Sequence, residues 1–228
     1  MMSNIILNFS PSGTYQLRIN SALAPLIQHS EEEFSRVCRE VEVFALPVYI
    51  SLVRVIVDHS RGDFVSCLSH LRKITSDLRP LMAAYYDRVH DATIARSAWL
   101  SHVQGFYAWG MGYQDEVTGE WIKFDGLSGN QVMLFQALDA FLGMDVYLSK
   151  EMLEGNVPRL QREFCAALKR ASFREGLGKE GVQGEIRKEM GEIVKRLRVS
   201  FFFFSFPFLP VILSQGARGE EANGSTAF

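Results

Sequence analysis

Ser128 and the glycines beside it are the residues of this chain whose types and spacing could do chemistry. The loop Gly126-Leu-Ser128-Gly129-Asn-Gln131 leads into a long apolar segment. A Ser followed three residues later by a Gln is a capping box, so the pattern predicts a helix that begins near Ser128. The first N–H groups of such a helix attract anions. Two interpretations stay open: a site for the carboxylate or phosphate of a ligand, or a plain helix cap.

The segment after this loop predicts a buried helix. From residue 132 to residue 142 the side chains are apolar almost all round, and only Gln136 and Asp139 interrupt them. A helix that is apolar on every side belongs in a core. Gly143 follows the last apolar residue and is expected to end the helix.

His102 is the one histidine that falls inside an aromatic pattern, on the same predicted helix face as Trp99 and Phe106. Such a residue is more often a core histidine than a ligand-binding group, and both interpretations are kept. The spacing of the histidines does not match a structural zinc or di-metal site. The chain has five of them: His29, His59, His70, His90 and His102. The sequence also lacks a P-loop, a dinucleotide-binding glycine motif, a zinc-protease motif and a nucleophile elbow.

The Ser128 loop and the buried helix together resemble the indoleamine 2,3-dioxygenase family. In that family a Gly-x-Ser loop is followed by a buried helix that carries an Asp and ends in Leu-Gly, which Asp139 and Gly143 match. The segment from Pro158 through Arg162 to Phe164 is similar to a later motif of the family. The resemblance spans roughly residues 42–198 and is nearest to a divergent, fungal-type branch.

This resemblance implies a haem-dependent dioxygenase that converts tryptophan, or a related indole, to N-formylkynurenine with O₂. It implies that the N–H groups of Ser128 and Gly129 lie at the edge of the haem. Ser128 would also border the substrate. His102 and Phe106 would lie on the distal side of the haem. Gln104 would stand near the substrate carboxylate, where the family has an Arg that can pair with a carboxylate through two hydrogen bonds. The expected partners are a small indole and O₂, and the expected state is a monomer.

The chain departs from the family at the iron. Haem iron needs an axial ligand from the protein, and the family supplies a His after the segment that resembles residues 185–198. No histidine follows His102 in this sequence. We therefore expect weak haem binding and little activity from this polypeptide. The alternatives are a different haem chemistry on a modified indole in secondary metabolism, and a non-enzymatic helical binding module.

Composition fits an ordinary globular protein, with 47% apolar and 22% charged residues and a net charge of −2. That charge gives no reason to expect nucleic acid or an anionic membrane as a partner. The three cysteines form no CxxC pair, which is typical of buried, reduced thiols. The first ten residues lack the basic start of a signal peptide, so the expected location is the cytoplasm.

The hydrophobic periodicity predicts an all-α fold. The family resemblance implies that this fold is a multihelical haem-domain core of the indoleamine 2,3-dioxygenase-like type. Residues 1–29 are expected to form an irregular lead-in, and residues 30–198 a partial helical domain. A capping box at Ser30 should start the first helix, which Pro47 should kink or divide. Further helices are expected after Asp63, Asp91, Ser128 and Pro158 and over residues 185–198. Residues 199–228 are interpreted as a disordered or mis-translated tail. The Phe, Ser, Pro and Leu residues after Val199 have pyrimidine-rich codons, so we interpret this stretch as a translated intron followed by a shifted reading frame and a disordered end.

Overall fold

The computed structural model describes residues 7–103, 112–123, 132–145 and 148–205, with only the backbone described at residues 84–86, 112–113, 123, 156 and 198–205. The helices and strands in this part of the chain are α2 (Pro25–Ser60), α3 (Phe64–Tyr86), α4 (Arg96–Ala98), a π-helical turn (Trp99–Val103), β1 (Gly112–Gln114), β2 (Trp121–Lys123), α5 (Met133–Phe141), α6 (Lys150–Asn156), α7 (Arg159–Arg170), a 3₁₀ turn (Arg174–Gly176) and α8 (Gly181–Ser205). Most of it is helical and very little is strand, which confirms the all-α class. The strands form one small antiparallel hairpin, with Tyr113 opposite Ile122.

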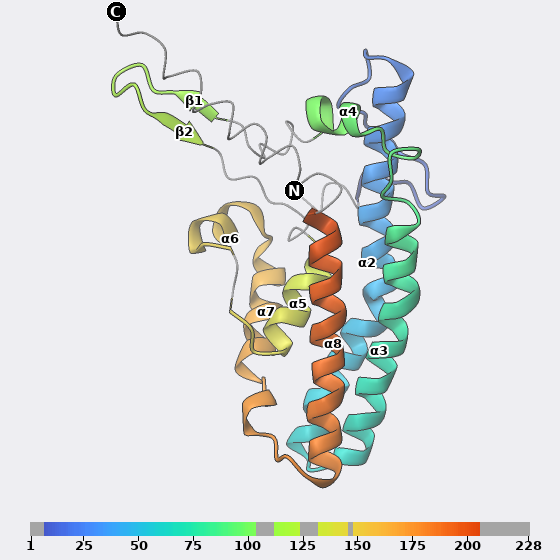
Figure 1. The fold of residues 1–228 in the computed structure, drawn as a ribbon, viewed down its shortest axis with the longest axis vertical. Helices are drawn as coiled ribbons and strands as arrows, with labels where there is room; N and C mark the ends of the chain where they lie inside the picture. Colours follow the sequence, from blue (N-terminus) through green and yellow to red (C-terminus); the bar gives the residue numbers. More distant parts are fainter. Residues whose placement is uncertain (1–6, 104–111, 124–131, 146–147, 206–228) are drawn as a thin grey trace, which may run out of the picture.

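Three long helices form the body of the molecule. Figure 1 shows α2 running in one direction along the long axis, and α3 and α8 returning in the other. The shorter helices α5 and α7 lie together on the side of α8 away from α3 (Figure 1), and α5 also contacts α2. One continuous apolar core joins these helices. Its largest fully buried side chains are Leu52, Leu71, Ile74, Leu78, Leu81, Leu134, Leu138, Phe141, Leu142, Ile186, Met190 and Ile193.

Helix α2 begins at Pro25, earlier than the predicted start at Ser30. Pro at the first helical position needs no N–H partner and already has a helical φ, so it is a strong start signal. Ser30 lies inside the helix and is buried. Its hydroxyl donates to the Leu26 carbonyl at 2.8 Å and accepts from the Ala95 N–H at 3.1 Å. The predicted capping box at Ser30 is therefore wrong, because that serine serves a tertiary contact.

Pro47 does not divide α2, which is a single helix of 36 residues. Pro47 lies on the exposed face of the helix, where the carbonyl that loses its N–H partner can reach water. Asp63 caps α3 as predicted, since its Oδ1 accepts from the Ser66 N–H at 3.0 Å. Asp91 also caps a helix, but from further away in the sequence than predicted. Its Oδ1 accepts from the N–H of Arg96 at 2.7 Å, and only the short helix α4 follows.

The lead-in is irregular from residue 7 to residue 24, as predicted, but it is fixed to α2. Glu31 is buried, and its carboxylate accepts from the Tyr15 hydroxyl at 2.8 Å and from the backbone N–H groups of Ile19 at 2.7 Å and Asn20 at 2.8 Å. Burial also raises the pKa of the Tyr15 hydroxyl to about 12. One carboxylate thus fastens the first described segment of the chain to the long helix.

Helix α8 runs from Gly181 to Ser205 and so passes the predicted boundary at residue 199. The side chains of Ile186, Met190 and Ile193 are completely buried in the core. Helix α8 packs against α3. The rest of the predicted tail, residues 206–228, lies outside the described residues. No helix in the described part of the chain is long and apolar enough to cross a membrane.

Candidate functional site

Of the five residues proposed from the sequence to bind substrate or cofactor, the structure describes His102 alone. Gln104 and Phe106 fall within residues 104–111, and Ser128 and Gly129 fall within residues 124–131, all outside the described residues. Whether these residues come together therefore stays a prediction. What can be examined is His102 itself and the buried helix α5 that follows the Ser128 loop.

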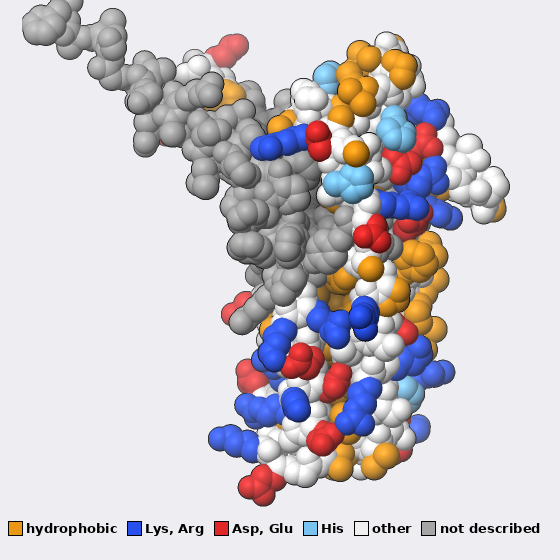
Figure 2. Space-filling model, turned by 45° about the vertical axis from the view of Figure 1, so that its right-hand side comes forward, with side chains coloured by type: hydrophobic (Ala, Val, Ile, Leu, Met, Phe, Trp, Pro, Cys, Tyr) orange, Lys and Arg blue, Asp and Glu red, His pale blue; other side chains and the backbone are white. Residues whose placement is uncertain are grey.

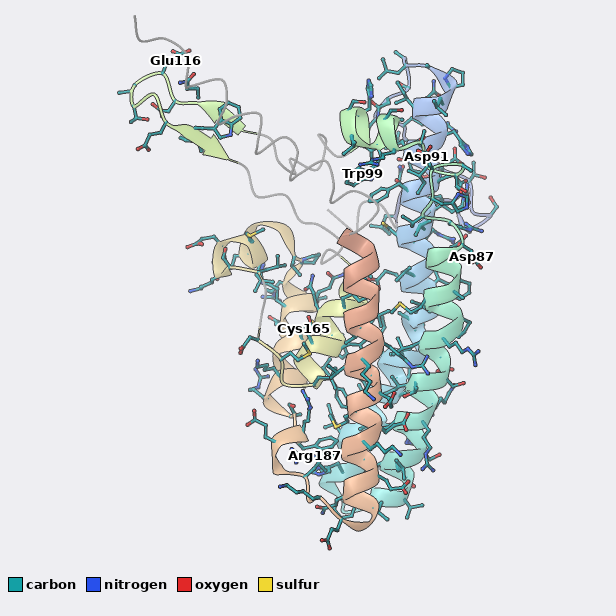
Figure 3. All side chains as sticks on the ribbon, in the orientation of Figure 1. Asp87, Asp91, Trp99, Glu116, Cys165 and Arg187 are labelled. Carbon is teal, nitrogen blue, oxygen red and sulfur yellow. The ribbon has the colours of Figure 1, made fainter. Side chains whose placement is uncertain are left out.

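His102 lies in the π-helical turn and is partly exposed. Its Nδ1 is 2.9 Å from the hydroxyl of its neighbour Ser101, and its backbone carbonyl accepts from Asn20 Nδ2 at 3.4 Å. Trp99, in the same turn, is buried and meets Phe34 edge-on, with ring centroids 6.1 Å apart. In Figure 3 the labelled Trp99 lies at the end of the molecule where α4 meets α2. The turn is thus tied to α2 and to the lead-in through its backbone and its tryptophan.

Helix α5 is buried as predicted, but it begins at Met133 and not near Ser128. Val132 precedes it in an extended conformation and provides no side-chain cap. The six buried residues of the helix are Leu134, Phe135, Ala137, Leu138, Ala140 and Phe141. Leu142 ends it, and Gly143 follows with φ = 72°, the left-handed conformation that only glycine adopts without strain. The predicted end of this helix is confirmed.

The cap of α5 comes from another helix. Glu42 of α2 is buried, and its Oε1 accepts from the Met133 N–H at 2.5 Å. Its Oε2 accepts from the Tyr49 hydroxyl at 2.6 Å. Burial raises the pKa of Glu42, while these hydrogen bonds act in the opposite direction. The positive end of the α5 dipole therefore already faces a carboxylate of the same chain.

This contact changes the prediction of an anion site at the start of the helix. The sequence suggested that the first N–H groups of α5 would be free to bind a ligand anion. The first N–H of the helix as described, that of Met133, is instead bonded to Glu42. An anion ligand would have to displace that carboxylate or use N–H groups that lie outside the described residues.

A second buried carboxyl group, Asp139, lies further along α5. Burial raises its pKa to about 6, although the positive charge of Lys169 on α7 lowers it. Its Oδ1 is buried and has no hydrogen-bond partner in the described part of the chain. Lys169 donates to the carbonyls of Gly143 at 3.3 Å and Met144 at 2.5 Å, which follow the end of α5.

Helix α7 completes a group of polar side chains around the buried Glu42, which we call the Glu42 cluster: Glu42, Tyr49, Asp139, Cys165 and Lys169. Phe164 meets Tyr49 edge-on, with ring centroids 6.2 Å apart. Burial raises the pKa of the Cys165 thiol to about 11, and the charges of Asp139 and Glu42 raise it further. Figure 3 labels Cys165 on α7, beside α5. A thiol with this pKa stays protonated at neutral pH and is a poor nucleophile.

Burial favours the neutral forms of the acidic groups in the Glu42 cluster. Burial also raises the pKa of Tyr49, and the negative charge of Glu42 adds to this. The cluster therefore has two carboxyl groups that resist ionisation and two hydroxyl or thiol groups that resist it more strongly. Within the described residues no group of three or more metal-ligating side chains comes together.

The histidines lie outside the core. All five are described, and none is among the buried side chains. His59 stacks on Phe173, with ring centroids 3.7 Å apart, and His70 Nδ1 pairs with Asp58 Oδ2 at 2.7 Å. His90 lies beside the Thr93 hydroxyl. An axial ligand must reach iron inside an apolar pocket, and the described histidines lie at the surface or are engaged there.

Glu42 and Tyr49 were not singled out from the sequence. The available signal was spacing: Glu42 falls between Cys38 and Ala45, at positions that continue one apolar face of the helix. A charged residue on such a face needs a buried partner. The sequence pattern could have marked Glu42 as buried, although it could not have identified Met133, 91 positions along the chain, as the partner.

The comparisons with known proteins add no identification. No family model matches the chain, and no curated protein matches it.

Proposed function

We propose that the chain is the helical core of a haem-dependent dioxygenase-like protein whose substrate is tryptophan or a related indole. The observation that carries the proposal is the order of motifs: the Ser128 loop, the buried helix with Asp139, and the segment from Pro158 to Phe164. The all-α class is consistent with it. So is the contact between α5 and α7, because the second and third motifs lie on these two helices.

The described residues do not fit a haem by themselves. Their histidines lie outside the core, and the two fully buried polar sites around Glu31 and Glu42 are already satisfied by hydrogen bonds within the chain. Haem, when bound, would supply the oxygen chemistry. Without an axial ligand in the described chain, we assign no catalytic step to any residue. The proposal for this polypeptide is therefore weak haem binding with little dioxygenase activity.

A different haem chemistry on a modified indole is the nearest alternative, and Gln104 favours it. A glutamine cannot form the charged pair with a free carboxylate that the family's Arg forms. A substrate whose carboxylate is absent or blocked would remove the need for that Arg. The substrate range of the protein distinguishes this alternative from a tryptophan dioxygenase.

A non-enzymatic helical module is the alternative from another class, and the cap on α5 favours it. Glu42 occupies the N–H group that would otherwise attract an anion, and its carboxylate is held from the other side by Tyr49. A helix whose positive end is neutralised within the chain needs no ligand for stability. On this reading the Ser128 loop is only a connection.

The test is a haem titration followed by absorption spectroscopy, on this chain and on a version rebuilt from the sequenced spliced transcript. We expect a strong Soret band typical of histidine ligation in the rebuilt protein alone. A matched control is His29→Ala in this chain, because His29 is exposed on α2 and lies outside the proposed site, so this change should leave any weak binding unchanged. No band in either protein would refute the haem proposal and leave the helical module. Tight, stoichiometric, histidine-ligated binding by this chain would refute the weak binding.

A further inference from the structure

The outer face of α2 carries a row of exposed apolar side chains. They are Val43, Leu46, Ile50, Val53 and Val57, with exposed fractions of 44%, 58%, 54%, 45% and 36%. The steps between them alternate between three and four residues, so on a helix they form one narrow row. We call this row the α2 stripe. The opposite face of the same helix is fully buried at Ala45, Val48 and Leu52. Helix α2 therefore has two apolar faces, of which the described part of the chain covers one.

The spacing of the α2 stripe is that of a helix that pairs with another helix. Alternating steps of three and four residues give the a and d positions of a heptad, which form the contact line of a coiled coil. A helix that meets only its own core shows a broader apolar face. Large branched side chains rarely gather on a solvent-exposed face without a partner.

The stripe is also symmetric about its central residue, Ile50. Val43 and Val57 lie at equal distances before and after it, and Leu46 and Val53 lie at nearly equal distances. If two copies of α2 meet in opposite directions around a two-fold axis near Ile50, each apolar residue faces an apolar residue of the other copy. Ile50 then faces Ile50. This is the self-complementary arrangement of an isologous dimer.

Charges beside the stripe favour the same pairing. Glu40 and Arg61 lie on the same edge of the stripe, at nearly equal distances from Ile50 on opposite sides. In an antiparallel pair Glu40 of one copy lies opposite Arg61 of the other, so opposite charges meet at both ends of the stripe. In a parallel pair Glu40 and Arg61 would lie at opposite ends of the interface and could not meet. Glu40 also accepts from Arg88 Nη1 at 2.9 Å, so its side chain is already directed within its own chain.

We propose that the α2 stripe is the contact surface of a homodimer, in which a second copy of the chain packs antiparallel along α2. This replaces the monomer expected from the sequence, and it does not depend on the proposed haem function. The contact line is short for a protein interface, so the dimer should form at about micromolar concentration. The partner that covers the stripe is a second copy of the chain, because the apolar row and the flanking charges of one copy both match those of an antiparallel second copy.

Sedimentation equilibrium of the full chain over about 1–200 µM, with haem absent, tests this. We expect the mass to rise with concentration from 25.8 kDa towards twice that value. Ile50→Glu places two carboxylates at the centre of the interface and should weaken association by at least about 30-fold. Val65→Glu is the matched control, because Val65 is an apolar residue on α3, 73% exposed and outside the stripe. It should leave the association constant unchanged. Circular dichroism checks that each variant folds.

Two mixing experiments separate this dimer from other occupants. Ile50→Glu and Ile50→Lys should each be monomeric alone, and a mixture of the two should form a heterodimer. Glu40→Arg and Arg61→Glu should each weaken the dimer, and the double variant should recover it if the helices are antiparallel. A chain that stays monomeric at every concentration overturns the proposal, since a segment of the same chain or another protein would then cover the stripe. A dimer that survives Ile50→Glu overturns it as well.

Discussion

Asp139→Asn is expected to stabilise the protein at neutral pH and to leave its stability unchanged in acid. Burial raises the pKa of Asp139 from 3.8 to about 6. The folded state therefore binds this proton more tightly than the unfolded state does. The stability that Asp139 contributes is full below pH 3.8 and is lost as the pH rises through about 6. Above that pH the folded protein carries a charge that its surroundings disfavour.

The size of the effect follows from the pKa shift. Each pKa unit corresponds to about 1.4 kcal/mol, which gives an upper limit of about 3 kcal/mol at pH 8. Asp139 is only partly buried and Lys169 is near it, so solvent and that positive charge reduce the cost. We expect Asp139→Asn to gain about 1–2 kcal/mol at pH 8. For a chain of this size that is a rise of roughly 3–6 °C in Tm.

The assay is thermal unfolding at pH 4, 5, 6, 7 and 8, with the difference between variant and parent as the readout. Asp115→Asn is the control of opposite sign. The backbone N–H groups of Thr118 and Val117 lower the pKa of Asp115, so removing its charge should destabilise the protein at neutral pH and have no effect in strong acid. If the gain from Asp139→Asn is constant between pH 4 and pH 8, the raised pKa is wrong.

Three further predictions concern buried groups. Glu42→Leu should lower the free energy of unfolding in urea by about 2–4 kcal/mol, because it removes the cap of α5 and leaves the Tyr49 hydroxyl without its partner. Glu42→Gln should lower it less, and equal stability of the parent and both variants would contradict the cap. The three thiols, with pKa values of about 12, 11 and 11, should react with a disulfide reagent at pH 7 at least about 100-fold more slowly than in the urea-unfolded chain, and one rapid thiol in the folded protein would contradict their burial. Glu31→Ala should speed hydrogen exchange in residues 15–20 while α5 keeps its protection, and unchanged exchange in the lead-in would show that Glu31 does not fasten it.

Local patterns predicted the elements whose signals are local. The buried helix α5 was predicted from its continuous apolar content, and the start of α3 from Asp63. Both rest on side chains that act within a turn or two of their own helix. The predicted start of α2 was wrong because it depends on a contact between residues that are far apart in the sequence. Ser30 looks like a cap in sequence, but its hydroxyl is used by Ala95, which is distant in the chain.

The two faces of α2 show why burial was harder to predict. Phe44 lies at helical spacing from the buried Val41, which favours a core position, yet Phe44 is 49% exposed and Glu42 between them is buried. When a helix has two apolar faces, the helical spacing of its apolar residues does not show which face is buried. Only the packing of α3 and α5 against one face decides which residues are covered. A site built from residues of three helices, such as the Glu42 cluster, cannot be read from any one of them.

Glu42 is the residue on which the candidate functions separate. If the start of α5 binds an anionic ligand, that ligand competes with the Glu42 carboxylate for the Met133 N–H, and Glu42→Gln should ease its entry by removing a negative charge. If the chain is a helical module, the same change only weakens a cap. Val43, the next residue, begins the α2 stripe on the other face, so dimerisation leaves Glu42 inside its own subunit. Ligand binding and dimerisation can therefore be altered independently, by changes at Glu42 and at Ile50.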